Sequence, residues 1–272
     1  MAEIYTDGTM PAAEKSGSGN TWKFFRWFIV IGSIALGIEL IWFLGVTPFK
    51  PFSRIDVYGF SWYDQNSLLA FAGLTQDSSY IFTNAKETEE RIASLPQIES
   101  VRVFKRFPDR LEINLSARKA AAFAFAESGG KTIPVVLDRQ GVIFQIGNTG
   151  QTDAYSDFPV LSGLAIEQPA LGMRLPAKFF PLLEELDAIR INAPELLSAV
   201  SEICVDKKSP EGFDITLYLL NHKIKIRLSD LNEELLRYSL LVADVLAVRE
   251  PDIDLIDFRG AIASYYPKGG YL

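Results

Sequence analysis

The sequence has little of the chemistry on which many enzyme active sites and metal centres depend. It contains one cysteine, Cys204, and one histidine, His222, among 272 residues. A disulfide framework, or a zinc site built from Cys and His ligands of one chain, is therefore excluded. We expect Cys204 to be a small buried apolar residue.

A nucleophilic site of the Ser-His-Asp or Cys-His kind would need His222 as its base. Alternating strands are predicted at 214–220 and 223–228, which places Asn221 and His222 in the turn between them. Because Asn and His both tolerate positive φ, the turn explains the histidine without catalysis.

A surplus of basic residues is also lacking. The formal net charge is -7 and the isoelectric point is near 5.0, which argues against nucleic acid as a partner. The glycine pairs at 129–130 and 269–270 lack a following helix and lysine, so phosphate binding is not indicated. We expect no cofactor, no metal and no catalysis.

Residues 1–22 are rich in Gly, Ser, Thr and Ala without periodicity, and predict a disordered tail. The apolar run at 27–46 is long enough for a helix to cross a bilayer, so we expect an anchor at 23–47. A signal peptide is the alternative, but no small-x-small cleavage pattern follows the run. Lys23 and Arg26 favour an N-terminus inside, a single pass through the cytoplasmic (inner) membrane and a chain that is mostly extracytoplasmic or periplasmic.

Glu39 lies near the middle of this span, where an isolated charge is costly. It is either protonated and tolerated or in contact with a polar group on a partner helix, so we treat it as a possible transmembrane contact.

Residues 51–119 predict a small β-α-α-β-β domain. The clearest element is the second strand of the hairpin, which follows the turn at 107–110. In it, Leu111, Ile113 and Leu115 alternate with polar residues. Asn84 and Glu87 predict the start of the second helix, and Pro96 its end.

Three motifs here, Val57-Tyr58-Gly59, Leu95-Pro96-x-Ile98-x-x-Val101-x-Val103 and Phe107-Pro108-x-x-Leu111-x-Ile113, resemble a POTRA domain of the FtsQ/DivIB bacterial division proteins. That family commonly continues with Glu-Arg-x-Pro. Here the segment is Ala117-Arg118-Lys119-Ala120, which keeps only the Arg.

The resemblance extends over residues 120–268. Asp138-x-x-Gly141 is similar to the family's Asp-x-x-Gly hairpin, and 158–163 to its Leu-Pro-Val-Leu-x-Gly. A helix after Pro176 and another at 231–248 are predicted by apolar spacing, the latter with its buried stripe at Leu235, Tyr238, Val242 and Val245. The whole is an α+β chain: one transmembrane helix, a POTRA-like domain, a β-rich mixed domain with a long helix towards its C-terminal side, and a tail at 269–272.

The resemblance implies a cell-division scaffold that links early to late septum-synthesis proteins. By carry-over, the final strand would dock an FtsB-like (DivIC-like) protein in complex with an FtsL-like one, and the POTRA-like domain would face FtsK, FtsW or FtsI. Arg259 of Asp257-x-Arg259 would pair with an acid of the partner, although Gly260 replaces the family's aromatic residue. The implied partner-binding residues are Arg259, Gly260, Ala261, Ile262, Ala263, Ser264, Tyr265 and Tyr266.

Three alternatives stay open. Asp257 and Arg259 can simply pair with neighbours inside the domain. The chain can be a membrane-anchored extracytoplasmic hydrolase that uses His222. It can also be a POTRA-bearing export component, although repeated POTRA units and barrel strands are lacking.

Overall fold

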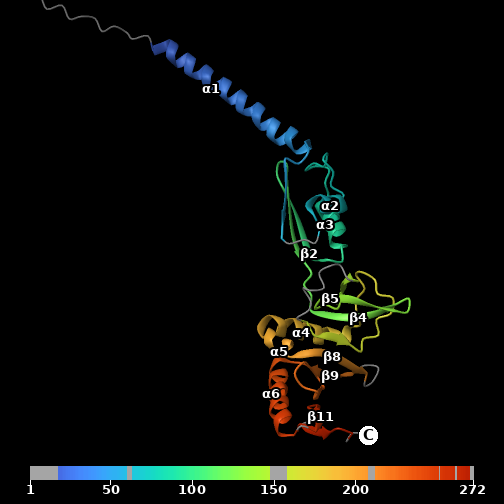
Figure 1. Cartoon of the computed structure of the whole chain (residues 1–272). Helices are drawn as coiled ribbons and strands as arrows, with labels where there is room; N and C mark the ends of the chain where they lie inside the picture. Colours follow the sequence, from blue (N-terminus) through green and yellow to red (C-terminus); the bar gives the residue numbers. More distant parts are fainter. Residues whose placement is uncertain are drawn as a thin grey trace, which may run out of the picture. The chain divides into compact units, whose positions relative to one another are not determined.

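The computed structural model describes residues 18–59, 63–147, 158–207, 212–250, 252–260 and 262–269. The chain has a mixed α+β fold (Figure 1). It separates into two compact units. The first consists of Met1–Asp56, Thr75–Thr83 and Lys105–Leu111, and the second of Val57–Leu74, Asn84–Phe104 and Glu112–Leu272.

The first unit begins with the helix α1 (Ser18–Ile41), which continues through a π-helical turn η1 (Trp42–Val46) and a 3-10 turn η2 (Thr47–Phe49). This segment is long and apolar enough, by length and composition, to cross a membrane. The helix starts five residues before the predicted anchor at 23–47. Of the disordered tail predicted at 1–22, residues 1–17 lie outside the described residues, and residues 18–22 belong to α1 instead.

Residues 54–117 form the predicted β-α-α-β-β order, in which the three strands pair in the order β1-β3-β2. The elements are β1 (Arg54–Tyr58), α2 (Gln65–Phe71), α3 (Ala85–Ala93), β2 (Ile98–Arg106) and β3 (Arg110–Ala117). A side chain caps the N-terminus of each helix. Asp64 accepts a hydrogen bond from the backbone N–H of Ser67 in α2, and Asn84 accepts one from that of Lys86 in α3. Asn84 therefore caps α3 as predicted, whereas Glu87 pairs with Arg91.

The alternation predicted for β3 is confirmed, because Leu111 and Ile113 are fully buried. In β2 the inward residues are Val101 and Val103, and Ile98 is also buried although it is out of phase with them.

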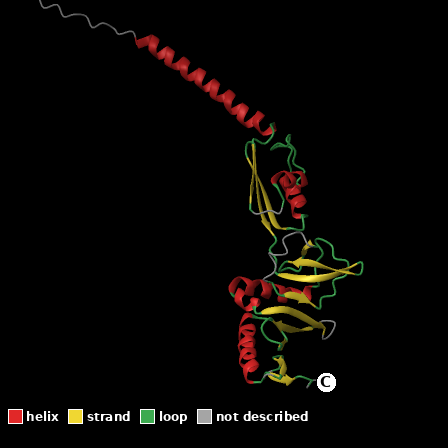
Figure 2. Ribbon diagram, in the orientation of Figure 1, coloured by secondary structure: helices red, strands yellow, loops and turns green. Residues whose placement is uncertain are grey.

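The second unit contains a sheet of nine strands in the order β12-β11-β10-β9-β8-β7-β4-β5-β6. Figure 2 shows these strands in yellow. Their bounds are β4 (Ala122–Ser128), β5 (Lys131–Leu137), β6 (Ile143–Ile146), β7 (Val160–Ser162), β8 (Val200–Lys207), β9 (Phe213–Leu219), β10 (Lys225–Leu228), β11 (Ile253–Asp257) and β12 (Ser264–Pro267).

The predicted Asp-x-x-Gly turn is present between β5 and β6. Asp138 accepts from the backbone N–H groups of Gln140 and Val142. Gly141 has φ +73°, a conformation that favours glycine. The turn therefore depends on the two residues that the sequence singled out.

The remaining helices are η4 (Ala177–Phe179), α4 (Phe180–Asn192), α5 (Pro194–Ser198) and α6 (Glu233–Arg249). They share one hydrophobic core with the sheet, to which α4 contributes Leu182, Leu183, Leu186 and Ile189 as predicted. This core holds the strands of the larger sheet in place.

The predicted buried stripe of α6 is wrong in part. Leu235 and Val242 are partly buried and pack against the core, but Tyr238 and Val245 are exposed. The fully buried residues of the helix are Leu236, Ser239 and Ala243. Apolar residues occur all round this helix, so spacing alone did not determine which side meets the core.

Candidate partner-binding site

The two edges of the nine-stranded sheet differ in what lies beside them. At the β6 edge, the backbone groups of Ile143 bond to Met173 and Gly172 at 2.8 Å each, so the segment 172–175 covers that edge. At the other end of the sheet, β12 pairs only with β11 among the described residues. An open edge presents unpaired backbone N–H and C=O groups to which a strand of another chain can bond.

Strand β12 is antiparallel to β11 and brings Tyr265 opposite Ile256 and Ser264 opposite Asp257. It is shorter than predicted, since Ile262 and Ala263 precede it. Pro267 ends the strand and lacks an N–H, so the edge offers donors only from 264 to 266.

The structure places most of the predicted site residues at the surface. Arg259, Gly260, Ile262, Ala263, Ser264 and Tyr265 are exposed and Tyr266 is half-buried. Ile262 is 81% exposed and Tyr265 is 56% exposed. Ala261 lies outside the described residues. Glu39 is exposed on α1, with no polar contact shown between it and any other described residue.

Arg259 is turned towards its own sheet. Its Nε and Nη2 donate to the carboxylate of Asp257, the latter at 2.6 Å, and its Nη1 donates to Asp214 Oδ2 at 2.6 Å. Asp214 belongs to β9, so the side chain reaches past β10. These contacts are the internal pairing that the sequence left open as an alternative to a partner contact.

The charges around Arg259 nearly balance. Arg227 of β10 lies opposite Asp257 in the parallel β10–β11 register, so two arginines accompany two aspartates. The hydrogen bonds from Arg259 hold the pKa of Asp257 below its ordinary value, and those from Asp257 and Asp214 raise the pKa of Arg259. Asp257 and Arg259 therefore stay ionised, and their hydrogen bonds fix the loop that leads into β12.

A second exposed surface lies on α6, and the sequence did not predict it. Four apolar residues are exposed at helical spacing: Tyr238, Leu241, Val245 and Val248. The ring of Tyr238 lies 5.9 Å from that of Phe258, which immediately follows β11. We call these four residues the α6 stripe. The sequence contains one signal for this stripe. Helix α6 has more apolar residues than a single buried face can hold.

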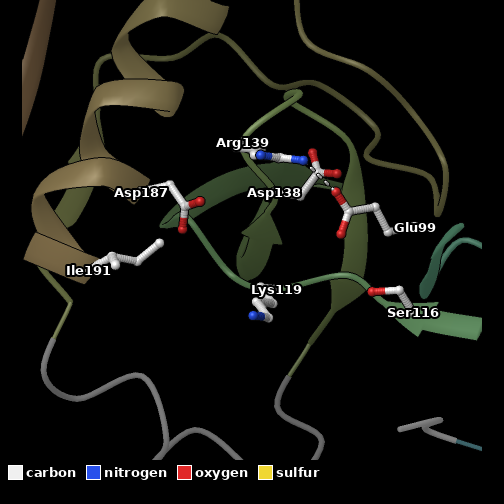
Figure 3. A pocket seen from close by; sticks show the side chains of 7 residues that line it. All are labelled: Glu99, Ser116, Lys119, Asp138, Arg139, Asp187 and Ile191. Atoms are coloured by element: carbon white, nitrogen blue, oxygen red, sulfur yellow. Dashed lines mark hydrogen bonds and ion pairs between the residues drawn. The ribbon is translucent and has the colours of Figure 1, made fainter. Parts of the chain in front are cut away.

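A small polar pocket of about 190 Å³ lies elsewhere in the second unit (Figure 3). Arg139 Nη2 lies 2.9 Å from Glu99 Oε1 at its wall. Asp138, which also lines the pocket, forms an ion pair with Arg118 in which both side chains are largely buried. Two residues of the resemblance, the Arg of 117–120 and the Asp of Asp-x-x-Gly, thus contact each other. This pocket is smaller than typical ligand sites.

Cys204 and His222 have separate acidic partners. Cys204 is half-buried, less than predicted, and its Sγ lies 3.7 Å from Asp206 Oδ1. Burial raises the pKa of this thiol, which disfavours the nucleophilic thiolate. His222 lies in the predicted turn, but its φ is negative, and its Nε2 is 2.8 Å from Asp244 Oδ1 of α6.

Together, these features describe a chain with one N-terminal helix that could cross a membrane, a small β-α-α-β-β domain of the POTRA kind and an open-edged sheet. Comparison with known families agrees: the model of the POTRA domain, FtsQ-type, matches residues 50–118. The model of the C-terminal region of cell division protein FtsQ/DivIB matches residues 124–259. The chain belongs to the FtsQ/DivIB family of cell division proteins.

Individual relatives bear the same names. The chain is 23% identical over 221 residues to cell division protein DivIB of Bacillus cytotoxicus, which covers 81% of this chain and 77% of that protein. It is 28% identical over 147 residues to cell division protein FtsQ of Koribacter versatilis, covering 54% and 39%. Family membership supports a role in cell division, and with α1 it fits a single-pass membrane protein.

Proposed function

We propose that this chain is a non-catalytic scaffold of the bacterial divisome that binds an FtsB-type (DivIC-type) partner along β12. The observation that supports the proposal best is the open edge of the nine-stranded sheet at β12. Helix α6, whose Tyr238 ring contacts that of Phe258 after β11, exposes further apolar residues. An extended segment added to β12 would bond to the unpaired backbone groups, and an adjoining helix or turn would cover the α6 stripe.

The edge is short, so backbone bonds alone would give modest affinity. Ser264, Tyr265 and Tyr266 are the residues of β12 that carry an N–H. The exposed side chains of Ile262 and Tyr265, together with the α6 stripe, add apolar area that a partner would bury. The docking surface is thus a strand edge flanked by apolar side chains.

In this proposal Arg259 both pairs with acids of its own sheet and donates to an acid of the partner. A guanidinium group has five N–H donors, and Asp257 and Asp214 engage three of its nitrogens, so donors remain for an acid of the partner. Gly260, Ala261 and Ala263, which have small or no side chains, would let a partner backbone approach this loop.

The proposed setting is the cytoplasmic membrane, with the N-terminus inside and the bulk of the chain extracytoplasmic. There the chain would join early division proteins to late septum-synthesis proteins, with the FtsL-type protein held through its FtsB-type companion. FtsK, FtsW and FtsI are the proposed neighbours of the POTRA domain.

The proposed docking is tested by titrating the detergent-solubilised full chain with the FtsB-type and FtsL-type proteins encoded by the same genome. Tyr265→Asp should weaken binding about tenfold or more, because it places a charge in the proposed interface. Leu171→Asp is the matched control: Leu171 is 50% exposed and adjoins the segment that covers the opposite edge. Equal affinity for the two variants would refute docking at β12.

Glu39 is proposed to contact a polar group on a transmembrane helix of a partner. Glu39→Leu should then weaken co-purification of the partner from membranes, whereas Glu39→Gln, which keeps hydrogen-bonding capacity, should preserve it. Undiminished co-purification with Glu39→Leu would remove this contact from the proposal.

A further inference from the structure

Four large apolar side chains of the first unit are exposed although they belong to three separate segments. Phe49 follows α1, Ile81 and Phe82 belong to the loop at 75–83, and Phe107 lies at the tip of the β2–β3 hairpin. Phe82 is 78% exposed and the others are about half exposed. We call these four residues the juxtamembrane face.

Contacts within the unit fasten all three segments to the end of the apolar helix. The ring of Phe107 lies 5.6 Å from that of Phe43, and the ring of Phe82 lies 6.1 Å from that of Phe49. Phe43 is in η1, so the hairpin tip touches the helix itself.

Backbone hydrogen bonds repeat the same connections. Ile81 donates to the carbonyl of Pro48, and Ser53 donates to that of Asp109 at 2.9 Å. The positions of the loop and of the hairpin tip are therefore set by the chain as it leaves the helix, not only by side-chain contacts.

The length of the helix sets the depth of these residues. About 20 helical residues cross a hydrocarbon core of about 30 Å, and the apolar run at 27–46 has that length. Phe49 follows three residues later, so the juxtamembrane face lies at the level of the lipid headgroups. Aromatic side chains favour this level.

The charge of the same segments suits anionic headgroups. Residues 50–56, 75–83 and 105–111 hold five basic and three acidic side chains, in a chain whose net charge is -7. Lys105 is used internally, since its Nζ donates to the carbonyls of Tyr80 and Thr83, and Arg54 pairs with Asp56. Lys50, whose Nζ lies 4.7 Å from the centre of the Trp42 ring, is exposed at the surface. Arg106 and Arg110 are also exposed.

We infer that the juxtamembrane face is a lipid-binding surface, inserted among the headgroups of an anionic bilayer next to the point where α1 leaves the membrane. The aromatic and aliphatic side chains enter the boundary of the acyl chains, while Lys50, Arg106 and Arg110 attract anionic headgroups. This is a second membrane attachment, distinct from α1 and independent of the proposed docking at β12.

The test uses the full chain in liposomes, with Cys204→Ser as the background, so that single cysteines introduced by Phe82→Cys and Phe107→Cys carry a nitroxide label. Leu220→Cys is the control, because Leu220 is apolar and 63% exposed but lies in the β9–β10 turn of the other unit. In phosphatidylcholine with phosphatidylglycerol, labels at 82 and 107 should collide with a water-soluble nickel chelate about threefold less often than the label at 220.

A charge variant separates the insertion of apolar side chains from the attraction of anionic headgroups. Neutralising Lys50, Arg106 and Arg110 to Gln should abolish any difference between anionic liposomes and phosphatidylcholine alone. Circular dichroism reports folding, and labels introduced by Phe49→Cys and Ile81→Cys replace any that disturb it. Equal nickel accessibility at 82, 107 and 220 would overturn the inference, as would shielding that develops only when a partner protein is added.

Discussion

Arg259 Nη1 donates a hydrogen bond to Asp214 Oδ2 at 2.6 Å, although 45 residues separate the two in the sequence. Asp214 lies in β9, and Arg259 follows β11, so the contact passes over the intervening strand β10. It ties the loop that precedes the edge strand to the interior of the sheet. The conformation of the loop that leads into β12 therefore depends on an internal ion pair.

Removing this guanidinium should loosen the β11–β12 hairpin. In Arg259→Ala, the buried carboxylate of Asp214 loses its ion-pair partner, and we expect the free energy of unfolding to fall by about 1–3 kcal/mol. Arg249→Ala, at an exposed position in the last turn of α6, should change it by less than about 0.5 kcal/mol. Urea unfolding of the full chain in detergent measures both, and equal values would contradict the role given to Arg259. Arg259→Glu is a poorer probe, because it adds a third carboxylate to the cluster.

The same cluster predicts a dependence on pH. The hydrogen bonds from Arg259 lower the pKa of Asp257 in the folded state, so its contribution to stability is complete above the unfolded pKa of about 4 and is lost as the pH falls through the folded value. The stability of the unmodified chain should thus fall more steeply below about pH 4 than that of Asp257→Asn. Urea midpoints measured across this range test the prediction, and parallel curves would refute it.

The two ion pairs beside the small polar pocket should differ in their energetic weight. Arg118→Met leaves the buried Asp138 without its cation and should cost about 3 kcal/mol. Arg139→Met breaks the more exposed pair with Glu99 and should cost about 0.5 kcal/mol or less. The comparison uses the same substitution at neighbouring sites and the same unfolding measurement. Equal losses in the free energy of unfolding would show that burial does not determine how much each ion pair contributes to stability.

Substitutions at two leucines of α6 distinguish an effect on stability from an effect on partner binding. Leu236 is fully buried and Leu241 is 60% exposed, so Leu236→Ala should lower the free energy of unfolding by about 3 kcal/mol and Leu241→Ala should leave it nearly unchanged. If the α6 stripe belongs to the docking surface, Leu241→Ala should nevertheless weaken partner binding about tenfold. Unfolding and titration of both variants check this, and unchanged affinity for Leu241→Ala would remove the stripe from the surface.

Features with local causes could be predicted from the sequence. The cap at Asn84, the turn between Asp138 and Gly141 and the alternation of Leu111 and Ile113 depend on residues that are close in the chain, and the structure contains all of them. Their physical causes are backbone conformation and period-two burial.

Features set by tertiary packing could not be predicted in this way. The buried side of α6 was predicted wrongly in part, because an apolar helix gives no contrast between faces. The Arg259–Asp214 contact requires the order of β9, β10 and β11 to be known, and sequence spacing does not give that order. His222 was explained by positive φ, whereas the structure instead gives it Asp244 as a partner.

Amide hydrogen exchange of β12 tests the central proposal most directly. Neighbouring N–H groups of an edge strand point to opposite sides, so at least one of Ser264, Tyr265 and Tyr266 faces away from β11. Strand addition by an FtsB-type partner predicts that exchange at this outward amide slows about tenfold or more in the saturated complex. Unchanged exchange throughout β12, with slowing confined to another surface of the chain, would contradict it.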